Sequence, residues 1–351
     1  MQQLSVVVIL SAMLAVWHSA PVRAGFEQMY NNEELQADAK RLETAVRKIY
    51  KLGIEPILTA EERRGLGRID FQFPMPRAGD DLMNFYAYHD GKKSVIVMPI
   101  LSLKSLEDLM TARAYVQKKN LSHGTIDIYY AMLRHRPIFK FKNARYPDIL
   151  TAMGIPKNAH EEKAVGDASL RMRNDAFAFI MVHELGHALF RHKGYDEITK
   201  QQARDDEIQS DRFALDVLNR AGSTPFGAFL FFQAQIYRFR HRSEFKTNGA
   251  WTDYLKTVAT HPMSVDRLRA FGNYTAKTVA EKRSSERVIW TFVGAGMTQM
   301  ADYLTDELMQ ECIAAVAKAS PLSILVPTPM TEDVGARLLV NECDKAFKKG
   351  D

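Results

Sequence analysis

The segment from Phe179 to Gly194 contains the residues whose types and spacing most clearly permit chemistry. It reads FIMVHELGHALFRHKG, with His183 and His187 four residues apart and Glu184 directly after the first histidine. On a helix the two imidazoles lie one turn apart on the same face, so both can bind one zinc ion with nitrogen ligands at about 2.1 Å. Glu184 lies about 100° round the helix, where a base for an activated water belongs.

The alternative for this segment is a buried helix whose histidines hydrogen-bond to carbonyl groups. Its remaining residues are mostly apolar, and Gly186 lets another backbone or a ligand approach closely. Glu184 and Gly186 together favour the metal site. We expect the helix to end at Lys193 and Gly194, with His192 supplying a positive charge near its C-terminus.

Two histidines leave a tetrahedral ion short of a ligand, and the segment 202–218 can supply the third. Its sequence, QARDDEIQSDRFALDVL, is helical in pattern, and Glu207 falls in the apolar half. Asp211 lies one turn later on the same face, where it can accept the spare N–H of a ligand histidine. The alternative is an exposed acidic face, because Asp205, Asp206 and Glu207 are consecutive and at least two of them should face solvent.

A third polar element is VATHPMSVDRLRAF, residues 258–271. Pro262 is acceptable in the first turn of a new helix. Read alone, His261 is an N-terminal capping residue and Arg267 lies on the surface. Read with the zinc motifs, His261 can donate a hydrogen bond to a developing oxyanion, and Arg267 can hold the loop by pairing with an acidic neighbour such as Asp211.

The elements that must position these residues indicate an α+β fold that is mostly helical, with a small mixed sheet before the histidine motif. Residues 32–52 and 102–119 have helical spacing, and 68–73 alternates like a strand. The stretch 84–100 reads as a hairpin around Asp90 and Gly91. From about residue 163 onward the pattern is almost entirely helical.

The 351 residues, 46% of them apolar, are ample for a core. The net charge of +5 is spread along the chain, so we expect no nucleic-acid partner. The apolar run Leu4–Val16 has signal-peptide length, and a cut after Ala24 fits the usual small-residue site. We therefore expect export. The alternatives are an uncleaved anchor or an N-terminal core helix.

No later segment reaches about 18 consecutive apolar residues, so we expect no stable membrane span in the mature chain. Cys312 and Cys343 are the only cysteines. In an exported chain they can form one disulfide, and two buried free thiols are the alternative. We divide the chain into a signal peptide at 1–24, a catalytic domain at 25–275 and a helical C-terminal extension at 276–351.

The three motifs, HELGH, EIQSD and THPMSVDR, resemble in content and order those of the HtpX-like and CAAX-prenyl-protease-type zinc metallopeptidases, a gluzincin family. The resemblance covers roughly residues 80–270, and Ser210 stands where the family usually has Ala. The intramembrane helices of many members are missing, which indicates the soluble exported subgroup and a periplasmic location.

The resemblance implies a zincin-like core that holds one Zn²⁺ per chain. It implies His183, His187 and Glu207 as ligands, Glu184 as the general base, and His261 as a group that stabilises the transition state. It also implies a strand edge that binds substrate in extended form, for which the stretch 94–100, SVIVMPI, is the candidate.

The expected function is that of a zinc metalloendopeptidase of the cell envelope, acting on misfolded or partly folded proteins. One alternative is a periplasmic chaperone or assembly factor whose zinc site is silent or plugged. Another is a zinc hydrolase that acts on cell-wall peptides. The expected partners are protein or peptide substrates, and an envelope complex that the sequence does not identify.

Overall fold

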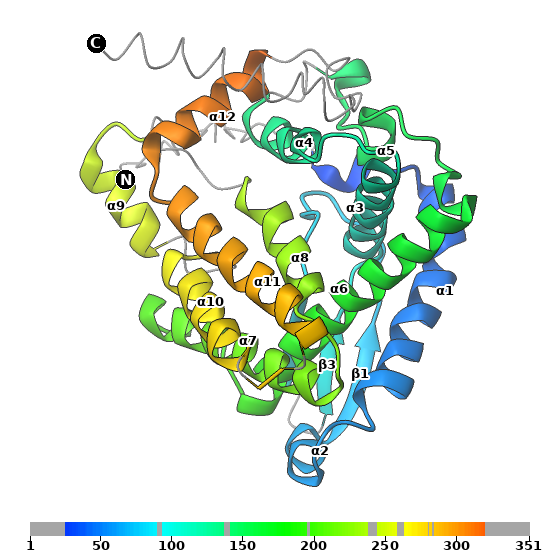
Figure 1. Ribbon diagram of the computed structural model, residues 1–351, viewed down its shortest axis with the longest axis vertical. Helices are drawn as coiled ribbons and strands as arrows, with labels where there is room; N and C mark the ends of the chain where they lie inside the picture. The colour runs from blue at the N-terminus through cyan, green and yellow to red at the C-terminus, as the bar shows by residue number, and fades with distance from the viewer. Residues whose placement is uncertain are drawn as a thin grey trace, which may run out of the picture.

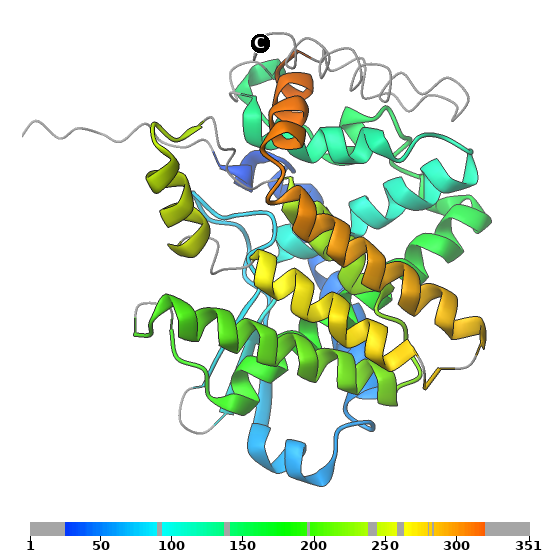
Figure 2. The ribbon, with the colours of Figure 1, turned by 60° about the vertical axis from the view of Figure 1, so that its left-hand side comes forward.

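The computed structural model describes residues 25–89, 93–136, 141–194, 197–237, 244–257, 263–279, 281–282 and 284–319. Within these ranges the fold is α+β, mostly helical with one three-stranded mixed sheet, as the sequence predicted (Figures 1 and 2). The predicted signal peptide 1–24 lies outside the described residues, as do His261, Cys343 and the predicted hairpin turn at Asp90 and Gly91.

The first α-helix of the described residues has clear start signals. Helix α1 (Asn32–Ile49) is capped by the side chain of Asn31, which accepts from the N–H of Glu34. The chain then continues through a π-helical turn (Tyr50–Ile54), so Gly53 does not stop it as a C-terminal glycine would. The next helix, α2 (Ala60–Leu66), is short and has a capping box at its N-terminus. It immediately precedes the first strand of the sheet.

The sheet has the order β1-β3-β2, built from β1 (Arg68–Gln72), β2 (Tyr86–His89) and β3 (Lys93–Val97). Strand β1 pairs with β3 in parallel, and β2 pairs with it antiparallel. The expectation that 94–100 forms a substrate-binding edge is wrong, because both edges of β3 are already paired. Residues 94–97 of β3 are all buried, as expected of a central strand that is covered on both faces. The edges of the sheet belong to β1 and β2.

Helix α6 (Lys163–Phe190) organises the rest of the fold. Its 28 residues make it about 42 Å long, and it packs against α3, α7, α8 and the sheet (Figure 1). Its hydrophobic residues are not confined to one stripe, as expected of a helix surrounded by other elements. The other helices are α3 (Ile100–Lys118), α4 (Gly124–His135), α5 (Ile149–Ala152), α7 (Lys200–Arg220), α8 (Phe226–Ile236), α9 (Asn248–Thr257), α10 (Val265–Val279), α11 (Ser284–Tyr303) and α12 (Glu307–Ala319).

The described part of the predicted C-terminal extension belongs to the same core as the rest of the protein. The boundary at residue 275 falls inside α10, and α11 packs along α10 and α8. Trp290, Val293 and Met297 of α11 are fully buried in the main apolar cluster. Cys312 of α12 is buried and disulfide-bonded. The only other cysteine in the sequence is Cys343, outside the described residues.

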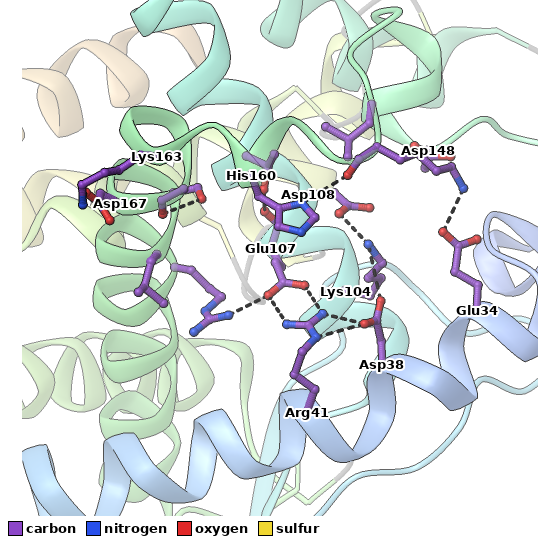
Figure 3. A pocket seen from close by; sticks show the side chains of 17 residues that line it. Glu34, Asp38, Arg41, Lys104, Glu107, Asp108, Asp148, His160, Lys163 and Asp167 are labelled. Carbon is purple, nitrogen blue, oxygen red and sulfur yellow. Dashed lines mark hydrogen bonds and ion pairs between the residues drawn. The ribbon is translucent and has the colours of Figure 1, made fainter.

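A network of ion pairs joins the first half of α6 to α1 and α3 around a charged cavity of about 540 Å³ (Figure 3). Glu107 accepts from both terminal nitrogens of Arg41, at 2.7 and 2.6 Å, and from Arg173 at 2.7 Å. Lys104 pairs with Asp108 at 2.6 Å. The side chain of Glu107 is 14% exposed. This carboxylate is therefore the shared, largely buried partner of two guanidinium groups.

None of the helices in the described ranges combines the length and the apolarity that crossing a bilayer requires.

Replacing Glu107 with Gln should lower the free energy of unfolding by on the order of 2 kcal/mol, because two guanidinium groups lose their shared anion. Burial alone would raise the pKa of Glu107, but Arg41 and Arg173 lower it below the ordinary 4.5. The stabilisation by Glu107 is therefore present above pH 4.5 and lost as the pH falls below it. Urea unfolding from pH 3 to 7 checks both effects.

The matched control is Glu43→Gln, which breaks the exposed pair between Glu43 and Arg47. It should change the unfolding free energy by less than about 0.5 kcal/mol. Equal losses for the two variants would show that the network around Glu107 is not a stabilising element.

Candidate metal centre

Two helices bring the three predicted ligands together. His183 and His187 come from α6, and Glu207 comes from α7. The two Nε2 atoms are 3.1 Å apart, and Oε2 and Oε1 of Glu207 each lie 3.5 Å from one of them. Among the described residues this is the one group of three or more His, Cys, Asp or Glu side chains with the geometry to hold a metal ion.

These distances fit a tetrahedral zinc site. Ligand atoms at about 2.1 Å from a tetrahedral ion are about 3.4 Å from one another, close to the 3.1 and 3.5 Å separations found here. Nε2 of each ring lies close to the other ring and to Glu207, so the three candidate ligand atoms surround one point. The donor set, two imidazoles and a carboxylate, is one that zinc accepts while keeping a position open.

The close approach of α6 and α7 depends on a small residue, as the sequence predicted. A Cβ on Gly186 would lie 3.0 Å from Cα of Ser210 and 3.2 Å from the ring of Phe213. Gly186 therefore allows the backbone of α7 to lie directly against α6. Gly186 directly precedes His187, and Ser210 lies about one turn after Glu207, so this contact sets the distance between the carboxylate and the imidazoles.

A buried guanidinium lies beneath the three ligands. Arg267 of α10 is 2% exposed. Its Nη1 lies 2.5 Å from Oε2 of Glu207, while Nε and Nη2 donate to both oxygens of Asp211 at 2.6 and 2.8 Å. Asp211, in turn, places Oδ1 2.9 Å from Nδ1 of His183. Arg267 thus lies against Asp211, the neighbour that the sequence analysis named, and it also contacts a predicted ligand.

The electrostatics of this group favour a cation at its centre. Burial alone would raise the pKa of Asp211, but Arg267 lowers it below its usual range, so the carboxylate stays ionised. Burial would likewise lower the pKa of His183, but Asp211 and Glu207 raise it to about 9. A metal ion that binds His183 must therefore displace a proton at neutral pH, and metal affinity should rise with pH.

His192 is a site residue that the sequence analysis assigned wrongly. The helix ends at Phe190, earlier than expected, because Arg191 adopts the left-handed conformation with φ of 57°. The reversed chain places Nδ1 of His192 3.0 Å from Nδ1 of His187. Its Nε2 lies 3.0 Å from Oε1 of Gln209. Burial lowers the pKa of His192, so it is neutral and does not act as a cation at the helix terminus.

This contact defines the tautomers of both rings. If Nε2 of His192 donates to Gln209, its Nδ1 can only accept, and Nδ1 of His187 must then donate to it. That arrangement leaves Nε2 of His187 with a lone pair for a metal. The two histidines of the motif therefore have separate partners at Nδ1, Asp211 for His183 and His192 for His187, as such ligands commonly require.

The acidic run at the start of α7 is more buried than the sequence indicated. Asp206 and Glu207 are 4% and 1% exposed, and only Asp205 faces solvent. The expectation of two exposed acids was wrong because Asp206 accepts from Gln202 at 2.6 Å and lies 3.5 Å from His192. A second buried carboxylate thus supports the ring that contacts His187.

The remaining predicted site residues are placed as follows. Glu184 is buried and follows His183 on α6, so it lies beside the metal-binding face of the helix. His261 lies outside the described residues, and its role stays a prediction.

The chain matches no family model, no curated protein and no solved structure.

Replacing His192 with Phe should weaken zinc binding about 10- to 100-fold, because the ring keeps its approximate size but no longer accepts from His187. Competition for zinc with a chelating dye measures the affinity, and circular dichroism checks the fold. His160→Phe is the matched control. Nδ1 of His160 contacts the carbonyl oxygen of Lys157 just before the start of α6, at the end of that helix far from the metal centre. Unchanged zinc affinity in His192→Phe would exclude a supporting role for this residue.

Proposed function

We propose that the protein is an exported zinc-dependent metalloendopeptidase of the cell envelope with a zincin-like core. The observation that supports this most directly is the convergence of His183, His187 and Glu207 at the separations of a tetrahedral site. Glu184 adds a carboxylate beside that point, and the ligands leave one coordination position for water or substrate. Peptide-bond hydrolysis is the reaction that this combination serves best.

Zinc, when bound, supplies Lewis acidity that polarises the scissile carbonyl and makes a nearby water easier to deprotonate. Glu184 takes the proton of that water and delivers it to the leaving amine. Asp211 and His192 hold the two imidazoles in orientation, and Arg267 keeps Asp211 ionised and pairs with Glu207. His261 stays the proposed donor to the oxyanion, on the strength of the sequence motif.

An extended substrate is best accommodated along an edge of the sheet. Strand β2 is an edge strand and packs against α6, the helix that carries Glu184. A peptide that adds to such an edge gains main-chain hydrogen bonds without depending on its sequence. This placement suits substrates that are unfolded at the cleavage site, such as misfolded or partly folded proteins.

The site is closed. The side chains of His183, His187 and Glu207 are 8%, 12% and 1% exposed, and Glu184 is 6% exposed. This burial suits a gated enzyme, and we propose that an opening motion admits the substrate. The same burial favours the second candidate, a chaperone or assembly factor whose zinc site stays closed.

Replacing Glu184 with Gln should abolish peptide hydrolysis while zinc stays bound, since Gln keeps the size of the side chain but cannot take a proton. New protein N-termini in cell envelopes that express the wild type or the variant provide the readout. Zinc content is measured on both purified proteins. Termini that appear only with the wild type would establish an endopeptidase and identify its substrates.

The matched control is Glu161→Gln, which removes an exposed carboxylate just before the start of α6, at the end of that helix far from the motif. It should produce the same termini as the wild type. If the wild type and Glu184→Gln give equal termini while both are folded and loaded with zinc, the peptidase proposal fails and the chaperone is favoured.

A further inference from the structure

A second cavity, of about 370 Å³, lies between α4, α8, α11 and α12. These four helices are neighbours in the fold (Figure 1). Helix α8 separates the cavity from the metal centre: Phe229, Gln233 and Ile236 line the cavity, whereas the rings of Phe231 and Phe232 pack against Phe179 of α6. The cavity is therefore independent of the metal centre.

Most of its wall is apolar. Ile128, Phe229, Met300 and Ile313 line it. The ring of Phe229 lies so close to α11 that a Cβ on Gly296 would be 2.4 Å from it. Met309, which is 40% exposed, stands where the cavity meets the surface. The volume and the apolar lining suit the body of a small organic molecule.

The other end of the cavity is polar, and Tyr237 hydrogen-bonds to Asp127 there. Asp127 lines it with a side chain that is 24% exposed, and it accepts from Nε2 of Gln233 at 2.9 Å. Oε1 of Gln233 is buried and has no hydrogen-bond partner among the described residues. Tyr237 and Tyr303 complete this end. Gln233, whose amide oxygen is buried and unpaired, and Asp127 thus both line this end of the cavity.

The charge of Asp127 is incompletely balanced. The nearest guanidinium, Arg113, is buried, but its Nη2 lies 4.0 Å from Oδ1 of Asp127, beyond hydrogen-bond distance. Nε and Nη2 of Arg113 have no hydrogen-bond partner within the described part of the chain. Burial raises the pKa of Asp127 to about 6, although Arg113 opposes the shift. The carboxylate is thus ionised at pH 7.5.

We propose that this cavity binds a small amphipathic amine, with its ammonium group on Asp127 and Gln233 and its apolar chain against Phe229, Met300 and Ile313. An ammonium group donates up to three hydrogen bonds, which matches the acceptors at the polar end. It also neutralises a largely buried carboxylate that has no cation within hydrogen-bond distance. An anionic head of the same size would meet Asp127 and be repelled.

The probe is octylammonium, titrated calorimetrically into the full-length protein at pH 7.5, with octanoate as the probe of equal chain length and opposite charge. Octylammonium should bind saturably at one site and at least tenfold more tightly than octanoate. Asp127→Asn should weaken octylammonium binding at least tenfold. Asp302→Asn removes an equal charge from the exposed surface of α11 and should leave binding unchanged.

Met309→Trp fills the mouth of the cavity from an exposed position, and it tests the site without altering the buried polar groups. It should weaken the binding of octylammonium even if Asp127→Asn fails to fold. Equal binding of octanoate, no saturable binding of octylammonium, or unchanged affinity in Met309→Trp would each overturn the proposal. These titrations do not depend on peptidase activity, so they stand apart from the proposed function.

Discussion

The candidate metal centre depends on one guanidinium that is shared by two buried carboxylates. Arg267 contacts Glu207 and Asp211, which lie one turn apart on α7, and it is almost completely enclosed. Two carboxylates so close together would otherwise repel each other and take up protons. With Arg267 in place the pKa of Asp211 stays low. Asp211 then retains the negative charge that a metal ion and the imidazoles above it require.

The same arrangement explains why the protein can hold histidines and carboxylates in its interior. Burying charges is costly unless each one is paired and hydrogen-bonded. Here Asp211 pairs with both Arg267 and His183, and His192 hydrogen-bonds to His187. A bound cation would replace the proton on His183 and complete the charge balance. The metal centre is thus an extension of a polar network that crosses from α6 through α7 to α10.

Helix α6 carries two polar regions at its two ends. Near its start, Arg173 joins the network around Glu107 that links α1 and α3 (Figure 3). Near its end, His183 and His187 supply two of the three candidate metal ligands. Residues 176–182, which lie between the two regions, are buried and apolar. On the far side of α8, the cavity beside Asp127 follows the opposite pattern, since its carboxylate lacks a close cationic partner. That difference is why we assign it a ligand.

Helical phase by itself determined which side chains of the metal centre face one another within each helix. The spacing of His183 and His187, and of Glu207 and Asp211, survives in any helix, because side chains one turn apart share a face. Hydrophobic periodicity likewise determined the mostly helical fold with a small sheet. The small side chain at Gly186 also signalled a close approach, although not which helix would make it.

Only the tertiary structure decided the contacts that depend on how the chain turns between elements. The left-handed residue Arg191 returns His192 to His187, and such a conformation is unusual for a residue other than glycine. The same turn places His192 beside Asp206 and so helps to bury that carboxylate. Strand β3 is central because β1 and β2, two separate segments of the chain, pair with its two edges. The cavity beside Asp127 forms only where four helices meet. Each of these is a relation between distant segments, which local periodicity does not encode.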